Sequence, residues 1–67
     1  MNTPRSIDIL AFPNVQLLDV TGPLQVFASA NDLARSQGLP PPYAPRVIAA
    51  EGGPVMSSAG LAMLAEP

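Results

Sequence analysis

One acidic residue, Asp19, stands inside the apolar stretch NVQLLDVTGPLQVF and is followed closely by Thr21-Gly22-Pro23. A carboxylate in this setting either accepts hydrogen bonds from the first amides of a helix or faces a pocket. In a pocket it would be a candidate general acid–base. The spacing alone favours the capping role, and both roles can coexist.

The rest of the sequence limits the available chemistry. It contains no cysteine and no histidine, so it lacks the usual zinc ligands and the commonest general base. Ser57 and Ser58 have neither histidine nor lysine to activate them, and Gly52-Gly53 lacks the spacing and the lysine of a phosphate-binding loop. We therefore expect no metal site, no cofactor and no catalysis by this chain alone.

Composition narrows the classes of partner. The 67 residues are 48% hydrophobic and 12% charged, with a net charge of -2, whereas about a quarter of residues are charged in a typical soluble domain. Three arginines and no lysine form no basic surface for nucleic acid. No apolar run reaches the roughly 20 residues that span a bilayer, and no signal-peptide pattern is present. The expected location is the cytoplasm, without membrane contact.

The elements that must position Asp19 follow from hydrophobic patterning. Residues 6–12 form a short apolar run that predicts a buried strand, in which Asp8 has a structural role near the strand's entry. A short turn over residues 17–20 then precedes a main helix from about Pro23 to Arg35, because proline is tolerated in a first helical turn. Gly38 is the expected helix stop. One helical face collects Val20, Leu24, Phe27, Ala28 and Asn31.

Further strands complete the predicted fold. Residues 43–50 contain a second apolar run, and VMSS and LAML predict a small hairpin around Ala59-Gly60. The order of strand, helix, strand and hairpin predicts an α/β class, as the N-terminal portion of a doubly wound, flavodoxin-like parallel sheet. Such strands need helices on both faces, and only one helix is predicted. We therefore expect residues 1–67 to be an incomplete N-terminal part of a single α/β domain.

Two motifs carry a resemblance to a known family. LLDVTGP with VF after it, and then GGPV with SSAGL, resemble the start of the ThiJ/PfpI superfamily, whose fold is class I glutamine amidotransferase-like. The likeness extends from about residue 6 to residue 64. Two branches share this opening: the ligand-sensing domain of AraC-type transcriptional regulators, and isonitrile hydratase with related small enzymes. The long segment 28–45, including Asn31, Leu33 and Tyr43, favours the regulators.

The resemblance implies a role for Asp19. In the enzymes of the superfamily the nucleophile is a cysteine at a strand-to-helix elbow further along the chain, and an acidic residue matching Asp19 leans toward its sulfur. By this likeness Asp19 would line a ligand pocket and be the acid–base partner of a cysteine that this chain does not contain. Gly22 is a second candidate ligand contact, because amides at the predicted helix start suit an anion.

The resulting hypothesis is an N-terminal fragment of the ligand-sensing domain of an AraC-type transcriptional regulator, which is not itself catalytic. The full protein would bind a small molecule, form a homodimer and contact DNA only through a C-terminal helix-turn-helix domain outside these residues. The alternative is a fragment of an isonitrile hydratase-like or other ThiJ/PfpI-family enzyme whose cysteine lies beyond residue 67. A remnant without function is a third possibility.

Overall fold

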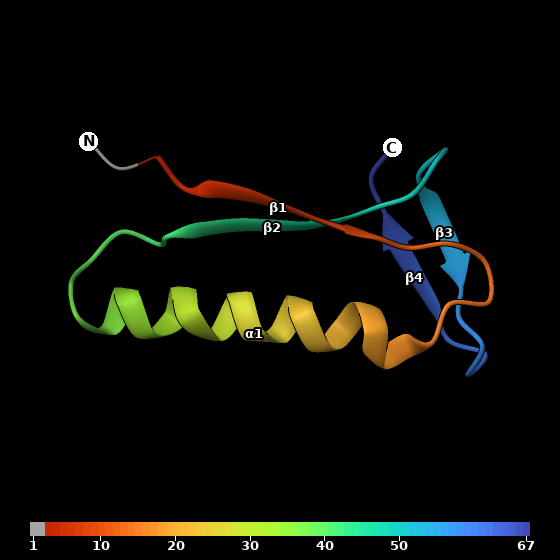
Figure 1. The fold of residues 1–67 in the computed structure, drawn as a ribbon, viewed down its shortest axis with the longest axis horizontal. Coiled ribbons are helices and arrows are strands. Elements are labelled where there is room, and N and C mark those ends of the chain that lie inside the picture. The colour runs from red at the N-terminus through yellow and green to blue at the C-terminus, as the bar shows by residue number, and fades with distance from the viewer. Residues whose placement is uncertain (1–2) are drawn as a thin grey trace.

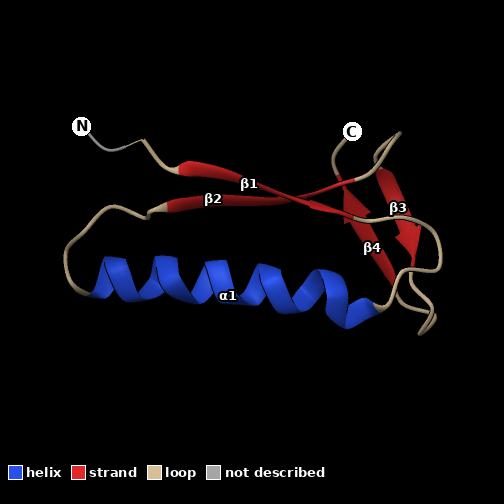
Figure 2. Cartoon of the chain, in the orientation of Figure 1, coloured by secondary structure: helices blue, strands red, loops and turns tan. Residues whose placement is uncertain are grey.

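The computed structural model describes residues 3–67 and has the predicted order of elements. A strand, a long helix, a second strand and a hairpin follow one another along the chain (Figures 1 and 2). Their bounds are β1 Arg5–Leu10, α1 Leu17–Ser36, β2 Tyr43–Ile48, β3 Gly53–Met56 and β4 Ala62–Ala65. The α/β class predicted from the sequence is confirmed.

The two long strands, β1 and β2, pair in parallel, with Arg5 opposite Tyr43 at one end and Leu10 opposite Ile48 at the other. The helix α1 connects them and lies along one face of the pair (Figure 1). Because side chains alternate along a strand, Ile7, Ile9 and Val47 join the core on this face. Because the strands are parallel, the carboxyl ends of β1 and β2 lie side by side at the same end of the sheet.

The hairpin of β3 and β4 is antiparallel, with Val55 opposite Met63. It is attached to both long strands just beyond their carboxyl ends, through an isolated bridge from Val15 to Ser57 and another from Ile48 to Glu66. The attachment uses backbone hydrogen bonds, among them Glu66 N–H to the Val47 carbonyl at 2.9 Å. The hairpin therefore lies across the carboxyl end of the sheet (Figure 1).

The start of the helix differs from the sequence prediction. Instead of a separate turn followed by a helix from Pro23, α1 is continuous from Leu17, and Pro23 lies inside it. Two contacts explain this: Val20, in the first turn, is only 1% exposed, and the Thr21 hydroxyl donates to the Leu17 carbonyl at 3.0 Å. Burying the first turn in the core outweighs the hydrogen bond that proline removes from a helix interior.

The end of the helix agrees with the prediction. Gly38 has a positive φ of 75°, a left-handed conformation that glycine adopts at little cost. Its N–H donates to the Arg35 carbonyl, and the Leu39 N–H donates to the Ala34 carbonyl at 2.9 Å. These are the two hydrogen bonds of a Schellman motif, which satisfies the last carbonyls of a helix.

The core is small and lies on one side of the sheet. Its buried apolar residues are Ile9, Ala11, Val15, Val20 and Val55. On the opposite face Leu10 is 61% exposed and Phe12 is 52% exposed, and no helix among residues 3–67 covers them. The expected cover on both faces is thus absent from the described part of the chain. Within the described residues, no helix combines the length and the apolar composition that a membrane-spanning helix needs.

Candidate functional site

A cavity of about 640 Å³ lies at the carboxyl ends of the two parallel strands. Its walls come from the segments that follow β1 and β2 and from β3, namely residues 10–13, 49–52 and 54–56. Ligands of open α/β sheets bind outside the carboxyl ends of the strands, and ligand pockets commonly measure about 300–1,000 Å³. We call this space the carboxyl-edge cavity.

The chain turns sharply on both sides of the carboxyl-edge cavity. Asn14 has a φ of 69°, a left-handed conformation that asparagine tolerates, and its N–H donates to the Met56 carbonyl at 2.8 Å. Gly52 has a φ of 70°, and a Cβ added there would lie 2.9 Å from the Pro67 nitrogen. Any other residue at Gly52 would push away the backbone at Pro67, which packs closely against this turn.

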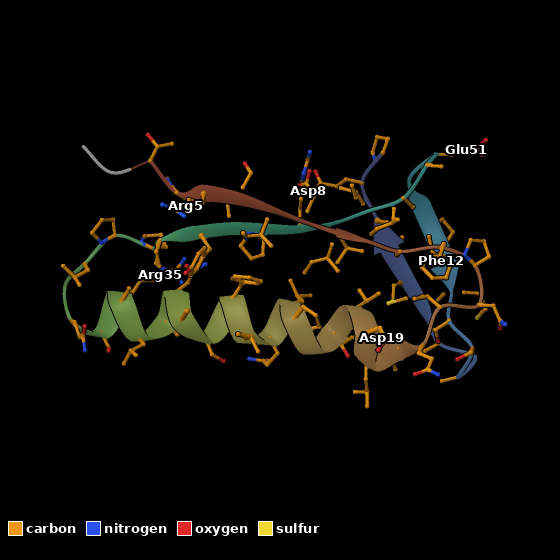
Figure 3. All side chains as sticks on the ribbon, viewed as in Figure 1. Arg5, Asp8, Phe12, Asp19, Arg35 and Glu51 are labelled. Carbon is orange, nitrogen blue, oxygen red and sulfur yellow. The ribbon has the colours of Figure 1, made fainter. Side chains whose placement is uncertain are left out.

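The lining of the carboxyl-edge cavity is mainly apolar. Phe12 and Met56 are about half exposed, whereas Val55 is buried. Glu51 contributes the one ionisable side chain among the lining residues. Figure 3 shows Phe12 and Glu51 at the end of the sheet that carries β3. The sequence pattern did not point to Phe12 and Glu51 as site residues, although Phe12 ends one predicted strand and Glu51 follows the other. The carboxyl ends of parallel strands meet at a shared edge.

Asp19 lies elsewhere. Its side chain is exposed in the first turn of α1, and it lines neither the carboxyl-edge cavity nor the cavity at the opposite end of the sheet (Figure 3). The helix-cap interpretation was wrong, because α1 begins two residues earlier and its N-cap is Gln16. An acidic side chain in a first turn still interacts favourably with the helix dipole. The role of Asp19 in a ligand pocket stays a prediction.

Gly22 lies in the second turn of α1 rather than at its start. Its amide is therefore not among the unpaired amides of a first helical turn, which was the reason for expecting an anion near it. The space beside it is open, since nothing lies within 4 Å of the position that a Cβ would take. Ligand contact at Gly22 also stays a prediction.

An ion pair occupies the sheet face opposite α1. Asp8 and Arg46 are opposite each other in the register of β1 and β2, and the Arg46 Nε donates to the Asp8 Oδ1 at 2.8 Å. The hydrogen bond from Arg46 lowers the pKa of the Asp8 carboxyl, and that hydrogen bond raises the pKa of Arg46 in turn. This pair fits the structural role expected for Asp8.

Asn31 joins the helix to the second strand. It is 6% exposed, its Nδ2 donates to the Tyr43 carbonyl at 2.9 Å, and its Oδ1 accepts from the Tyr43 N–H at 3.0 Å. The Tyr43 ring meets Phe27 edge to face, with ring centroids 4.8 Å apart. The sequence placed Asn31 on the buried helix face but did not reveal this pairing.

Residues 3–67 contain no cluster of three or more acidic, histidine or cysteine side chains that could hold a metal ion. The serine hydroxyl of Ser57 is also engaged structurally. Ser57 is 3% exposed, and its Oγ accepts a hydrogen bond from the Leu61 N–H at 3.2 Å in the hairpin turn. Of the two cavities at the ends of the sheet, the carboxyl-edge cavity has the more apolar lining, and we take it as the candidate site for a small molecule.

Comparison with known proteins gives a relative from Streptomyces lividans. Over 63 residues, or 94% of this chain, the sequence is 33% identical to a Streptomyces lividans protein named for its place in the cpoL 5′ region and described as uncharacterized. The chain spans 40% of the length of that relative. No family model and no solved structure matches the chain.

Proposed function

We propose that this chain is the N-terminal part of a ThiJ/PfpI-like α/β domain that binds a small molecule, as in the sensor domains of AraC-type transcriptional regulators. The observation that carries the proposal is the carboxyl-edge cavity, because it lies where open α/β sheets bind ligands. Its mainly apolar walls with a single ionisable residue are typical of ligand sites. A binding role needs no nucleophile.

The exposed sheet face supports the idea that the domain extends beyond these residues. Leu10 and Phe12 lie on this face, and the Streptomyces lividans relative is considerably longer than the matched segment. In a longer protein, further helices would pack on this face and add a wall to the carboxyl-edge cavity, which Leu10 and Phe12 line. The domain would form a homodimer, and DNA would be contacted by a separate C-terminal helix-turn-helix domain. Ligand would act by binding one arrangement of that protein more tightly than another.

An enzyme of the isonitrile hydratase type is the second candidate. It is favoured by Asp19, whose carboxylate is exposed in the first turn of α1 and is therefore accessible to a group supplied by another part of the protein. In that case, a cysteine outside this chain would be the nucleophile and Asp19 its acid–base partner. The two candidates differ in whether bound ligand is recovered unchanged.

Ligand binding can be tested with cyclohexanol, a neutral apolar probe, by following backbone amide shifts in NMR spectra at millimolar probe concentrations. We expect the largest shifts in residues 10–13 and 49–52. Ala50 is exposed and lines the cavity, so Ala50→Phe should fill it and abolish these shifts. Ala44→Phe, at an exposed position of β2 outside the cavity, is the matched control and should leave them intact. If cyclohexanol causes no amide shifts in the unmodified chain, the proposal is contradicted.

A further inference from the structure

In the described part of the chain, the only charged side chain that lines the carboxyl-edge cavity is the negatively charged Glu51. Glu51 is exposed at the cavity, and within residues 3–67 it forms no ion pair. The ten other residues that line the cavity are uncharged. A ligand in this cavity would therefore meet one uncompensated carboxylate against apolar walls.

The arginines of the chain lie away from this carboxylate. Arg46 is paired with Asp8 on the face of the sheet, and Arg35 is paired with Asp32 near the end of α1. Arg5 lines the cavity at the opposite end of the sheet. Figure 3 shows Arg5 near the start of β1, far along the strand from Glu51. With a net charge of -2 on the chain, the electrostatic potential at the carboxyl-edge cavity favours a cation.

We infer that the ligand of the carboxyl-edge cavity is a small apolar amine, bound as its ammonium ion. This inference rests on the proposed function and names the ligand class of the same site. The ammonium group donates hydrogen bonds to the Glu51 carboxylate, and the apolar body contacts Phe12, Val55 and Met56. The half-exposed Phe12 ring adds an aromatic face, which also attracts a cation.

The opposite end of the sheet provides an internal comparison. A second cavity there, of about 620 Å³, is lined by Arg5 together with Ala34, Leu39 and the prolines at positions 40–42. It has a similar size, but its walls are more polar and its one ionisable group is cationic. A carboxylate ligand should therefore avoid the carboxyl-edge cavity, and any shifts that it causes should lie near Ala34 and Leu39.

Three probes with one carbon skeleton test the inference: cyclohexylamine, cyclohexanol and cyclohexanecarboxylate, each titrated at neutral pH and followed by amide NMR shifts. At residues 49–52 we expect the ammonium to bind about two- to fivefold more tightly than the alcohol, the range of an exposed ion pair, and the carboxylate to bind most weakly. This advantage should shrink as salt is added.

Variants separate the local charge from the net charge. Glu51→Gln should remove the advantage of the ammonium over the alcohol without weakening the alcohol. Asp32→Asn removes the same charge at an exposed site near the end of α1 and should leave the advantage unchanged. Equal binding of all three probes, or a preference that survives Glu51→Gln, would overturn the inference while the proposed function stands. If no probe shifts residues 10–13 or 49–52, both fail.

Discussion

The pairing of Asp8 with Arg46 arises from the parallel register of two strands. The residues are 38 positions apart in sequence, and their side chains meet because the register places them opposite each other. On an exposed face such a pair contributes little to stability. Its effect is measurable instead in the protonation of Asp8.

The pKa of Asp8 is lowered in the folded chain, chiefly by the hydrogen bond from Arg46. A lowered pKa stabilises the fold at pH values above the unfolded pKa, and the stabilisation is lost as the pH falls through the folded pKa. We expect the carboxyl carbon of Asp8 to titrate below the ordinary range of aspartate in NMR measurements. Arg46→Gln should raise that midpoint, and Arg35→Gln should leave it in place. If the titration midpoint of Asp8 is the same in Arg46→Gln as in the unmodified chain, the ion pair is absent in solution.

Asn31 is expected to be the polar side chain whose loss costs the most stability. Asn31→Ala removes two hydrogen bonds to the Tyr43 backbone, whose N–H and carbonyl then lack these partners. We expect the free energy of unfolding in urea to fall by about 1–3 kcal/mol. Gln25→Ala, which removes an exposed amide hydrogen-bonded to Ser29, is the control and should change it by less than about 0.5 kcal/mol. Equal losses in the two variants would refute the role of Asn31.

At the scale of elements, α1 contains a residue that works against it. Pro23 has no N–H, so the carbonyl of Asp19 lacks the partner that it would have in a regular helix. Pro23→Ala should restore that hydrogen bond and raise the free energy of unfolding by up to about 3 kcal/mol. The gain should come with slower hydrogen exchange of the amides around position 23.

Pro40→Ala, in the loop after α1, is the control for this prediction. There the substitution only increases the conformational entropy of the unfolded chain. It should lower the free energy of unfolding by about 0.4–1 kcal/mol. The experiment also distinguishes a helix that begins at Leu17 from one that begins at Pro23. If the helix began at Pro23, as its sequence signals suggest, Pro23→Ala would bring no gain, because proline suits a first turn.

The sequence predicted the type and order of the elements because these depend on local patterning. The apolar runs gave both long strands to within two residues at either end, and Gly38 gave the helix stop. The helix start was wrong because Thr21-Gly22-Pro23 is also a good start signal, and only the burial of Val20 in the core shows that the helix begins earlier. That burial is a tertiary contact, which local patterning does not contain.

The whole molecule is long and narrow, with one helix packed against one two-stranded sheet and a hairpin at one end (Figure 1). Its Cα atoms extend over 38 × 20 × 12 Å, with a radius of gyration of 13.3 Å, whereas a compact chain of this length would have about 11 Å. The accessible surface of 4750 Å² likewise exceeds the roughly 4,000 Å² typical of a folded chain of this mass. This excess surface is consistent with the proposal that the chain is one part of a larger domain.

The candidate site could be predicted less well than the fold. The carboxyl-edge cavity depends on three separate segments meeting, and its third wall, β3, is placed by the bridges from Val15 to Ser57 and from Ile48 to Glu66. These bridges leave no pattern in the sequence. The motif around Asp19 stands out by its composition, whereas Glu51 lies in an ordinary turn and is a candidate only through the residues that surround it in the structure.

The parallel pairing of β1 with β2 also sets a delay during synthesis. Arg5 pairs with Tyr43, so the first strand leaves the ribosome 38 residues before its partner. At translation rates of about 5–20 residues per second, an apolar strand waits about 2–8 s without a neighbour. For those seconds the apolar segment that becomes β1 has no partner strand, so its backbone groups cannot yet form the hydrogen bonds of the sheet.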